Sequence, residues 1–285
     1  MIAYLGLGLL GSNFVRAMVR RGEKVQVWNR SPDRARALEA EGVRAFDRVE
    51  DAVRGASRVH LTLSDDAAVD DVLGRALSAL APGAVVLDHT TTSSAGTGAR
   101  AARLEAAGIS FLHTPVFMGP SNARDATGIM LASGPRERFE LVRPELEKMT
   151  GRLVYLGPDP ARAAVFKLLG NLFLIEMVGS MVDVFSLARS AGVTPADAVT
   201  LFDLFNPAAA IGPRAQRMLD GQFDDPSWTL EMARKDVRLM LETGERSGAH
   251  FIELPGIARE MDAWLARGNA KRDWMVIAQD AVKKP

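Results

Sequence analysis

The chain has 285 residues, of which 47% are hydrophobic and 25% are charged, as is typical of a globular protein with a sizeable core. Its 35 basic and 35 acidic side chains balance, which argues against a surface of one charge for nucleic acid or membranes. The absence of cysteine excludes disulfides, cysteine-based zinc sites and thiol nucleophiles.

The first half of the chain alternates short apolar runs with longer amphipathic segments. The runs predict strands at Ile2–Leu5, Lys24–Trp28, Arg58–Leu63, Ala84–Leu87, Ser110–His113, Ile129–Ala132 and Leu153–Leu156. The segments between the early strands predict helices at Leu10–Arg21, Pro32–Glu41, Val49–Arg54, Ala67–Leu80 and Ser94–Ala107. This alternation predicts an α/β fold with a doubly wound, mostly parallel Rossmann sheet.

The pattern changes after Gly157-Pro158, where only helices are predicted. These are Pro160–Ala191, Pro195–Phe205, Ala208–Leu219, Thr229–Arg246, Leu254–Arg267 and Trp274–Val282. We therefore expect a Rossmann domain over 1–158 and an all-helical domain over 159–285, joined by a long interdomain helix. Asn171, Glu176 and Asp183 interrupt the apolar run of that helix, which favours a buried helix over a membrane span.

A glycine-rich loop follows the first predicted strand and opens the first helix. It reads Gly6-Leu7-Gly8-Leu9-Leu10-Gly11, a GxGxxG pattern. Gly6 permits a tight turn, Gly8 allows a pyrophosphate to approach the backbone, and Gly11 allows the helix to pack closely on the strand. The free N–H groups of the helix favour phosphate at the same place. This context predicts dinucleotide binding.

The end of the second strand bears on the choice of cofactor. It reads Asn29-Arg30-Ser31, without the acidic residue that usually binds the ribose hydroxyls of NAD. A guanidinium and a hydroxyl suit a 2′-phosphate, although a surface arginine and a helix cap would look the same. We expect NADP(H) to be preferred, with NAD(H) also possible.

Further motifs occur in a fixed order along the chain. Leu63-Ser64-Asp65-Asp66 follows a strand, and Asp88-His89-Thr90-Thr91 follows the next. Lys167 and Asn171 lie on the long helix, and Lys235-Asp236 lies on a later one. With the N-terminal GLGLLGSNF, these motifs resemble those of the β-hydroxyacid dehydrogenases, which include 3-hydroxyisobutyrate and 6-phosphogluconate dehydrogenases and glyoxylate/succinic semialdehyde reductases.

The resemblance implies roles for these residues. Leu63, Ser64, Thr91 and Lys235 would contact the cofactor, and the alternative for Lys235 is a solvated helix face with i,i+4 pairs. Lys167 and Asn171 would be catalytic. The helical domain would bind substrate and dimerise.

One loop departs from the family pattern. The family holds the substrate carboxylate with a PVSGG-like loop, and here Phe117 replaces its serine. Met118, Gly119, Ser121 and Asn122 remain candidate substrate contacts through backbone N–H groups or polar side chains.

Lys167 lies within an apolar segment, and Asn171 follows it on the same helix face. Hydride transfer to a carbonyl develops negative charge on oxygen, which a positioned ammonium can stabilise and protonate. A lysine that extends to solvent along an apolar surface is the structural alternative.

We therefore predict an NADP(H)-dependent oxidoreductase that transfers a hydride between nicotinamide and a small carbonyl or hydroxy compound, with Lys167 as the proton donor or acceptor. Imine reduction on the same scaffold and a noncatalytic NADP-binding sensor are the alternatives. We expect a cytoplasmic homodimer or homotetramer with a small-molecule substrate and no nucleic acid or membrane partner. The four histidines show no metal-ligand spacing, so no metal is expected.

Overall fold

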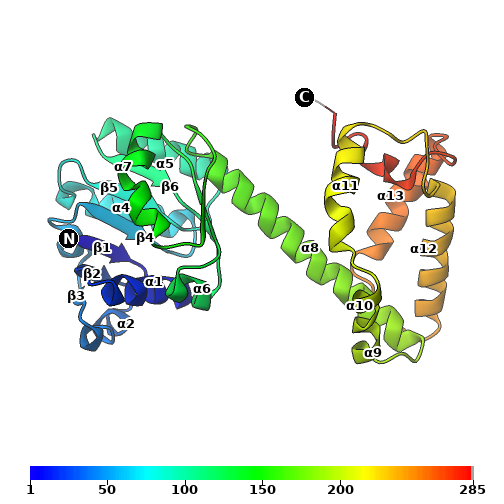
Figure 1. Cartoon of the computed structure of the whole chain (residues 1–285), viewed down its shortest axis with the longest axis horizontal. Helices are drawn as coiled ribbons and strands as arrows, with labels where there is room; N and C mark the ends of the chain where they lie inside the picture. Colours follow the sequence, from blue (N-terminus) through cyan, green and yellow to red (C-terminus); the bar gives the residue numbers. More distant parts are fainter. Residues whose placement is uncertain (284–285) are drawn as a thin grey trace. The chain divides into compact units, whose positions relative to one another are not determined.

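The computed structural model describes residues 1–283 and divides into two compact units (Figure 1). The first unit, Met1–Asn171, contains a six-stranded sheet in the order β3-β2-β1-β4-β5-β6. All of its strand pairs are parallel. This is the doubly wound dinucleotide-binding order, so the α/β Rossmann prediction is confirmed.

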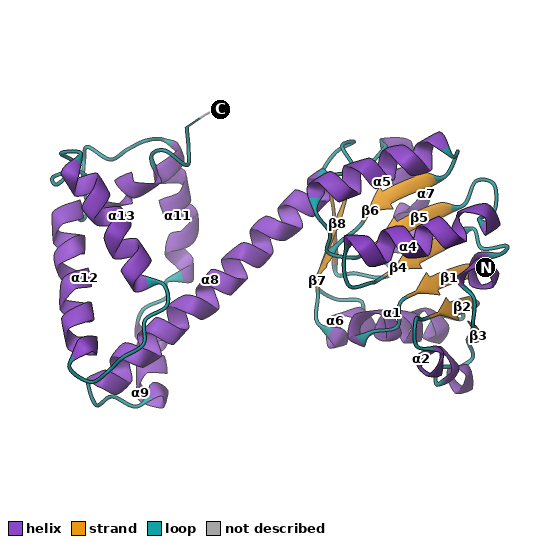
Figure 2. Ribbon diagram, turned by 180° about the vertical axis from the view of Figure 1, so that it is seen from behind, coloured by secondary structure: helices purple, strands orange, loops and turns teal. Residues whose placement is uncertain are grey.

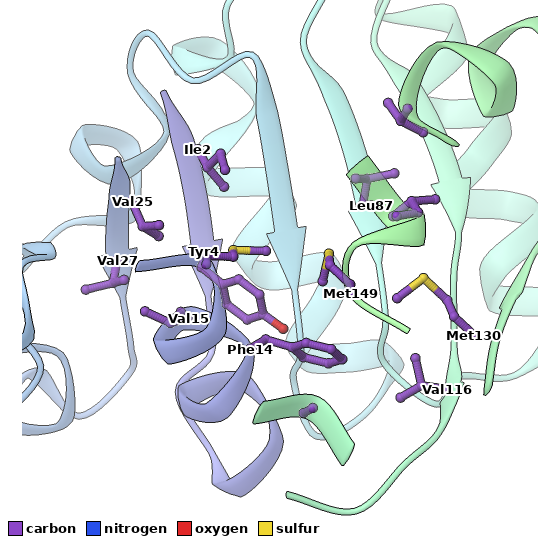
Figure 3. Packing of buried hydrophobic residues seen from close by; sticks show 14 of the residues in the cluster. Ile2, Tyr4, Phe14, Val15, Val25, Val27, Leu87, Val116, Met130 and Met149 are labelled. Carbon is purple, nitrogen blue, oxygen red and sulfur yellow. The ribbon is translucent and has the colours of Figure 1, made fainter. Parts of the chain in front are cut away.

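The sheet is buried on both faces, and successive side chains alternate between two cores. In β1, Ile2 and Tyr4 point to one core, whereas Ala3 and Leu5 point to the other. Figure 3 shows Tyr4 of the first core packed beside Phe14 of helix α1. The strands are β1 Ile2–Leu5, β2 Val25–Trp28, β3 Arg44–Phe46, β4 Arg58–Leu61, β5 Val85–Asp88 and β6 Ser110–His113.

Helices cover both faces of this sheet (Figure 2). Helices α1 (Leu9–Arg20), α2 (Pro32–Arg36), α6 (Pro120–Asp125) and α7 (Arg136–Glu147) contribute to the first core. The second core is covered by α3 (Val49–Val53), α4 (Asp66–Ala76) and α5 (Ser94–Ala106). Short 3₁₀ turns at Glu39–Glu41 and Leu77–Ala79 extend α2 and α4.

A second sheet of three strands completes the first unit. Strand β8 (Ile129–Ala132) pairs antiparallel with β7 (Val116–Phe117) and parallel with β9 (Arg152–Tyr155). Sequence reasoning missed β3, β7, α6 and α7. The two strands are too short to show a period, and a proline at position 144 interrupts the pattern of α7.

The second unit is helical. It comprises most of α8 (Arg162–Ser190), with α9 (Pro195–Val199), α10 (Leu201–Leu204), α11 (Ala208–Leu219), α12 (Leu230–Glu245) and α13 (Leu254–Ala266). Its core gathers Phe223, Leu230, Met261 and Trp264. Two expected helices differ: 195–205 breaks at Thr200, and 274–282 is a 3₁₀ helix over Trp274–Ala278.

Helix α8 differs from expectation in its exposure. It was predicted to be buried, yet only 6% of its most apolar window is buried in the single chain. Leu172, Phe173 and Ile175 are about half exposed or more. The helix is long and apolar enough to cross a membrane by length and composition alone, a test that the core helices of soluble proteins also pass. The rest of the single chain therefore does not bury this helix, and its burial stays a prediction.

Candidate active site

A cavity of about 510 Å³ lies at the carboxyl ends of β1, β2 and β4. Open parallel sheets bind their ligands at this edge. Its lining includes most of the residues that the sequence assigned to the cofactor. The lining residues are Gly6, Gly8, Leu9, Leu10, Trp28, Asn29, Arg30, Ser31, Arg34, Thr62, Leu63, Ser64, Ala68, Asp71, Val72 and Arg75. Leu7 and Gly11 belong to the same turn but do not line the cavity.

The glycine turn shapes this cavity. Gly6 has a φ of 96°, and a Cβ there would lie 2.2 Å from the carbonyl oxygen of Thr62. A Cβ at Gly11 would lie 2.1 Å from the carbonyl oxygen of Gly6, so helix α1 can approach the strand only without a side chain. At Gly8, by contrast, a Cβ would meet nothing within 4 Å. The backbone at Gly8 is thus open to a phosphate group, as a dinucleotide requires.

Asn29 joins the glycine turn to the end of β2. Its Oδ1 accepts a hydrogen bond from the Leu7 N–H at 2.8 Å, and its Nδ2 donates to the Ser31 carbonyl at 3.1 Å. Asn29 therefore positions both segments by its side chain. Ser31 is the N-cap of α2, but its hydroxyl makes no capping bond, and the residue lines the cavity.

Three arginines line the cavity against one aspartate. Arg30 was predicted from the sequence, whereas Arg34 and Arg75 were missed. Arg34 lies on α2, four residues after Arg30, which precedes the helix. Arg75 comes from α4, and its guanidinium lies 5.5 Å from the ring centroid of Trp28. Only the folded sheet brings it to the end of β2.

The loops after β4 and β5 are bonded to each other. The Leu63 N–H donates to Thr90 Oγ1 at 3.0 Å, and the Thr90 N–H donates to Asp88 Oδ1 at 2.9 Å. Thr91 is exposed, which leaves its side chain on the surface of this loop. Ser64 lines the cavity.

A buried polar cluster lies behind these loops. Asp88 is fully buried, 3.6 Å from the guanidinium of the equally buried Arg100. Burial raises the pKa of Asp88 to about 6, against the lowering effects of Thr90 and Arg100. His60 Nδ1 and His89 Nε2 lie 3.0 Å apart in the same region, and His113 is buried beside Asp88. The His60–His89 contact and the Asp88–Arg100 ion pair connect β4, the end of β5 and α5 inside the unit.

Lys167 lies on α8 within the first unit and is only 9% exposed. Its Nζ donates to Asn171 Oδ1 at 2.9 Å and lies 4.2 Å from the ring centroid of Phe117. Burial lowers the pKa of Lys167 below its ordinary value. We call Lys167, Asn171, Phe117 and the nearby Gly170 the lysine corner.

Strand β8 supports both sides of this corner. Phe117 of β7 pairs with Ile129 of β8. Ser133, which follows β8, donates to the Pro160 carbonyl at 2.9 Å and accepts from the Ala163 N–H at 3.0 Å. The start of α8 is therefore anchored to the strand that holds Phe117, which explains why the first compact unit extends to Asn171.

The loop after Phe117 contains the other expected substrate contacts. Asn122 Oδ1 accepts the Gly119 N–H at 2.9 Å, and Asn122 Nδ2 donates to Thr127 Oγ1 at 2.9 Å. Met118 is partly buried, and Ser121 is exposed. Two of the expected anion donors are thus already bonded within the loop.

Lys235 belongs to α12 in the second unit. Its Nζ lies 2.7 Å from Asp236 Oδ1, and its side chain is 42% exposed. A solvated helix face would show the same ion pair. The role of Lys235 near the cofactor therefore stays a prediction.

A family profile described as the NAD binding domain of 6-phosphogluconate dehydrogenase matches residues 1–157. An uncharacterized oxidoreductase of Shewanella frigidimarina is 27% identical over 88% of this chain and 87% of its own. Glyoxylate/succinic semialdehyde reductase 1 of Arabidopsis thaliana is 24% identical over 92% and 91%. The structure of an imine reductase from Streptomyces aurantiacus, 26% identical, superposes with a TM-score of 0.90 over 99% of both chains.

The residues of the cavity fit a nicotinamide dinucleotide: an open backbone at Gly8, the first turn of α1, and arginines at the end of β2. The matched profile covers more than half of the chain, and the relatives span nearly all of it. The chain therefore belongs to the β-hydroxyacid dehydrogenase family, that of the NAD-binding domain of 6-phosphogluconate dehydrogenase, and is an NAD(P)-dependent oxidoreductase.

Proposed function

We propose that the protein is an NADPH-dependent reductase of small carbonyl compounds in which Lys167 donates the proton. The observation that carries this proposal is the state of Lys167, a residue that is only 9% exposed, whose Nζ donates to Asn171 Oδ1 and whose pKa is lowered by burial. A lysine that only extended to solvent would keep its ammonium hydrated.

The chemistry assigns separate tasks to these side chains. A bound nicotinamide would supply the hydride that reduces the carbonyl carbon. As negative charge develops on the carbonyl oxygen, the Lys167 ammonium stabilises it and transfers a proton to it. Asn171 holds the ammonium in place through its Oδ1 and does not titrate. In the reverse direction, neutral Lys167 would accept the proton of the alcohol.

The preference for NADPH follows from charge at the end of β2. Arg30 and Arg34 line the cavity beside the Ser31 hydroxyl, and Arg75 lines it from α4. A 2′-phosphate adds about two negative charges, which a cluster of guanidinium groups binds well. The place of Lys235 beside the cofactor is part of the same proposal.

Imine reduction is the second candidate, favoured by the likeness to the Streptomyces aurantiacus imine reductase. A lysine with a lowered pKa could also donate a proton to the nitrogen of an imine. NADPH oxidation, followed with matched panels of aldehydes, ketones and preformed imines, separates the two functions. We expect the carbonyl compounds to be reduced faster, and reduction of imines alone would overturn the proposal.

A second copy of the chain is proposed to cover α8. In the second unit Leu172, Phe173, Ile175 and Val178 expose about half or more of their surface. A contiguous apolar surface of this kind is typical of a subunit interface. Light scattering should give a dimer or tetramer at micromolar concentration. A monomer would contradict this proposal.

A further inference from the structure

The ring of Phe117 fills space that a side chain at position 170 would need. A Cβ at Gly170 would lie 2.3 Å from Phe117 Cζ and 2.6 Å from its Cε1. Gly170 lies inside a long helix, where glycine is unfavourable relative to alanine. The ring therefore rests against the bare backbone of α8 at this point, and a side chain at position 170 would require the ring to move.

The same ring covers one side of the Lys167 ammonium, 4.2 Å from its centroid. The same ammonium donates a hydrogen bond to Asn171 Oδ1 at 2.9 Å. An ammonium has three N–H donors, so the arrangement leaves room for one substrate oxygen. The ring face attracts a cation and repels an anion, because its electrostatic potential is negative.

The loop that follows Phe117 has donors that would bind a carboxylate, but two of them are engaged. The Gly119 N–H is taken by Asn122 Oδ1, and one of the two N–H groups of the Asn122 amide donates to Thr127 Oγ1. A carboxylate packed against the ring would lose its hydration without gaining these partners. An apolar group would instead gain contact with the ring.

Resting on the proposed reductase function, we propose that Phe117 and Gly170 determine specificity: the lysine corner takes an uncharged carbonyl compound with an apolar substituent on the Phe117 ring and excludes one with a carboxylate there. Phe117 touches the proton donor and forms the apolar wall, and Gly170 is a positioning residue that makes room for the ring.

The first test compares neutral and acidic substrates of similar size. We expect the native protein to reduce isobutyraldehyde and 2-pentanone with a kcat/KM about tenfold or more above that for glyoxylate and succinic semialdehyde. Phe117→Ser should narrow or reverse this ratio by about tenfold, because it replaces a repelling ring with a hydroxyl donor. Phe166→Ser, which removes an exposed ring from the neighbouring helix position, is the matched control and should leave the ratio unchanged.

Measurements of ligand binding distinguish a failure of this specificity proposal from a failure of the proposed reductase function. Calorimetry of the NADP⁺ complex with isobutyramide and isobutyrate measures the same preference without turnover. If the native protein binds the amide more tightly and Phe117→Ser loses this preference, the specificity proposal is supported. If, in addition, no carbonyl compound is reduced, only the proposed reductase function is overturned. Equal or tighter binding of isobutyrate by the native protein overturns the specificity proposal.

A double-mutant cycle tests the pair. Gly170→Ala should lower kcat/KM for isobutyraldehyde by about tenfold in the native background and by less than about twofold in the Phe117→Ser background, where the clash is gone. Gly98→Ala, a helical glycine whose Cβ would have its nearest neighbour at 4.0 Å, is the control for the glycine change itself. Effects of Gly170→Ala that are the same in both backgrounds would overturn the pairing.

Discussion

The cofactor cavity is shaped by backbone, whereas the lysine corner is shaped by side chains. Around the cavity, glycines permit a turn and a close helix, and Asn29 holds the loop through the Leu7 N–H. In the corner, an aromatic ring, an ammonium and an amide fix one another. Side chains can be exchanged without rebuilding the fold, so substitutions in the corner can alter its chemistry while the backbone of the cavity stays the same.

The largest effect should follow removal of Lys167, the proposed proton donor. Lys167→Ala is expected to lower kcat by roughly 10²–10⁴-fold, the usual contribution of a positioned general acid. Affinity for NADPH should stay within a few-fold, because the proposed role of Lys167 is at the substrate oxygen. Stopped-flow reduction and a cofactor titration measure the two quantities. Lys148→Ala, at an exposed lysine paired with Glu145, is the control, and near-native turnover of Lys167→Ala would show that Lys167 is structural.

Two variants of the glycine turn should differ in their effects on protein stability and on cofactor binding. Gly6→Ala places a Cβ 2.2 Å from the Thr62 carbonyl at a φ of 96°, so we expect a loss of roughly 3 kcal/mol in unfolding free energy. Gly8→Ala meets nothing within 4 Å and should leave stability within about 1 kcal/mol while weakening NADPH binding. Urea denaturation and cofactor titration of the two variants make the comparison, and equal stability losses would contradict it.

The buried histidines of the polar cluster behind the cavity should lower the stability of the folded protein in acid. Burial lowers the pKa of His89 to about 4 and of His113 to about 3, and holds that of His60 well below its ordinary value. The unfolded chain binds these protons below about pH 6.5 and the folded one does not, so each histidine removes about 1.4 kcal/mol of stability per pH unit as pH falls below that value. Asp88, with a pKa raised to about 6, binds a proton in the folded state and offsets one histidine between about pH 6 and 4.

The net expectation is a loss of about 2–3 kcal/mol in unfolding free energy between pH 6 and pH 5. Urea denaturation at the two pH values measures it. His113→Phe should reduce the slope of unfolding free energy against pH by the contribution of one histidine, about 1.4 kcal/mol per pH unit. His250→Gln, at an exposed position, is the control and should leave the slope unchanged. A slope that stays the same in His113→Phe would show that this histidine does not carry the effect.

The cavity could be predicted from the sequence far better than the corner. Gly6, Gly8 and Arg30 lie within one strand–turn–helix–strand unit, so local pattern was enough to place them. The spacing of Lys167 and Asn171 predicted their shared helix face, which the structure has. The contact of Phe117 with Gly170 joins segments more than fifty residues apart, through a two-residue strand that shows no period. Arg75 was missed for the same reason, because only the packing of α4 brings it to β2.

The smallest effect concerns the proposed preference for a cofactor with a 2′-phosphate, a proposal that rests on side chains alone. Arg30 is exposed and lines the cavity with Arg34 and Arg75, so it supplies one of three positive charges and is partly screened by salt. Arg30→Asp should therefore weaken NADPH binding by roughly tenfold at low ionic strength and less at high ionic strength, with a smaller change for NADH. Arg36→Asp makes the same change of charge in α2 at a residue that pairs with Asp47 outside the cavity, and it should leave the NADPH/NADH ratio nearly unchanged. Fluorescence titration of the native protein and of the two variants with NADPH and NADH measures these affinities. Equal dissociation constants for NADPH and NADH in the native protein would show that the arginines do not select the phosphate.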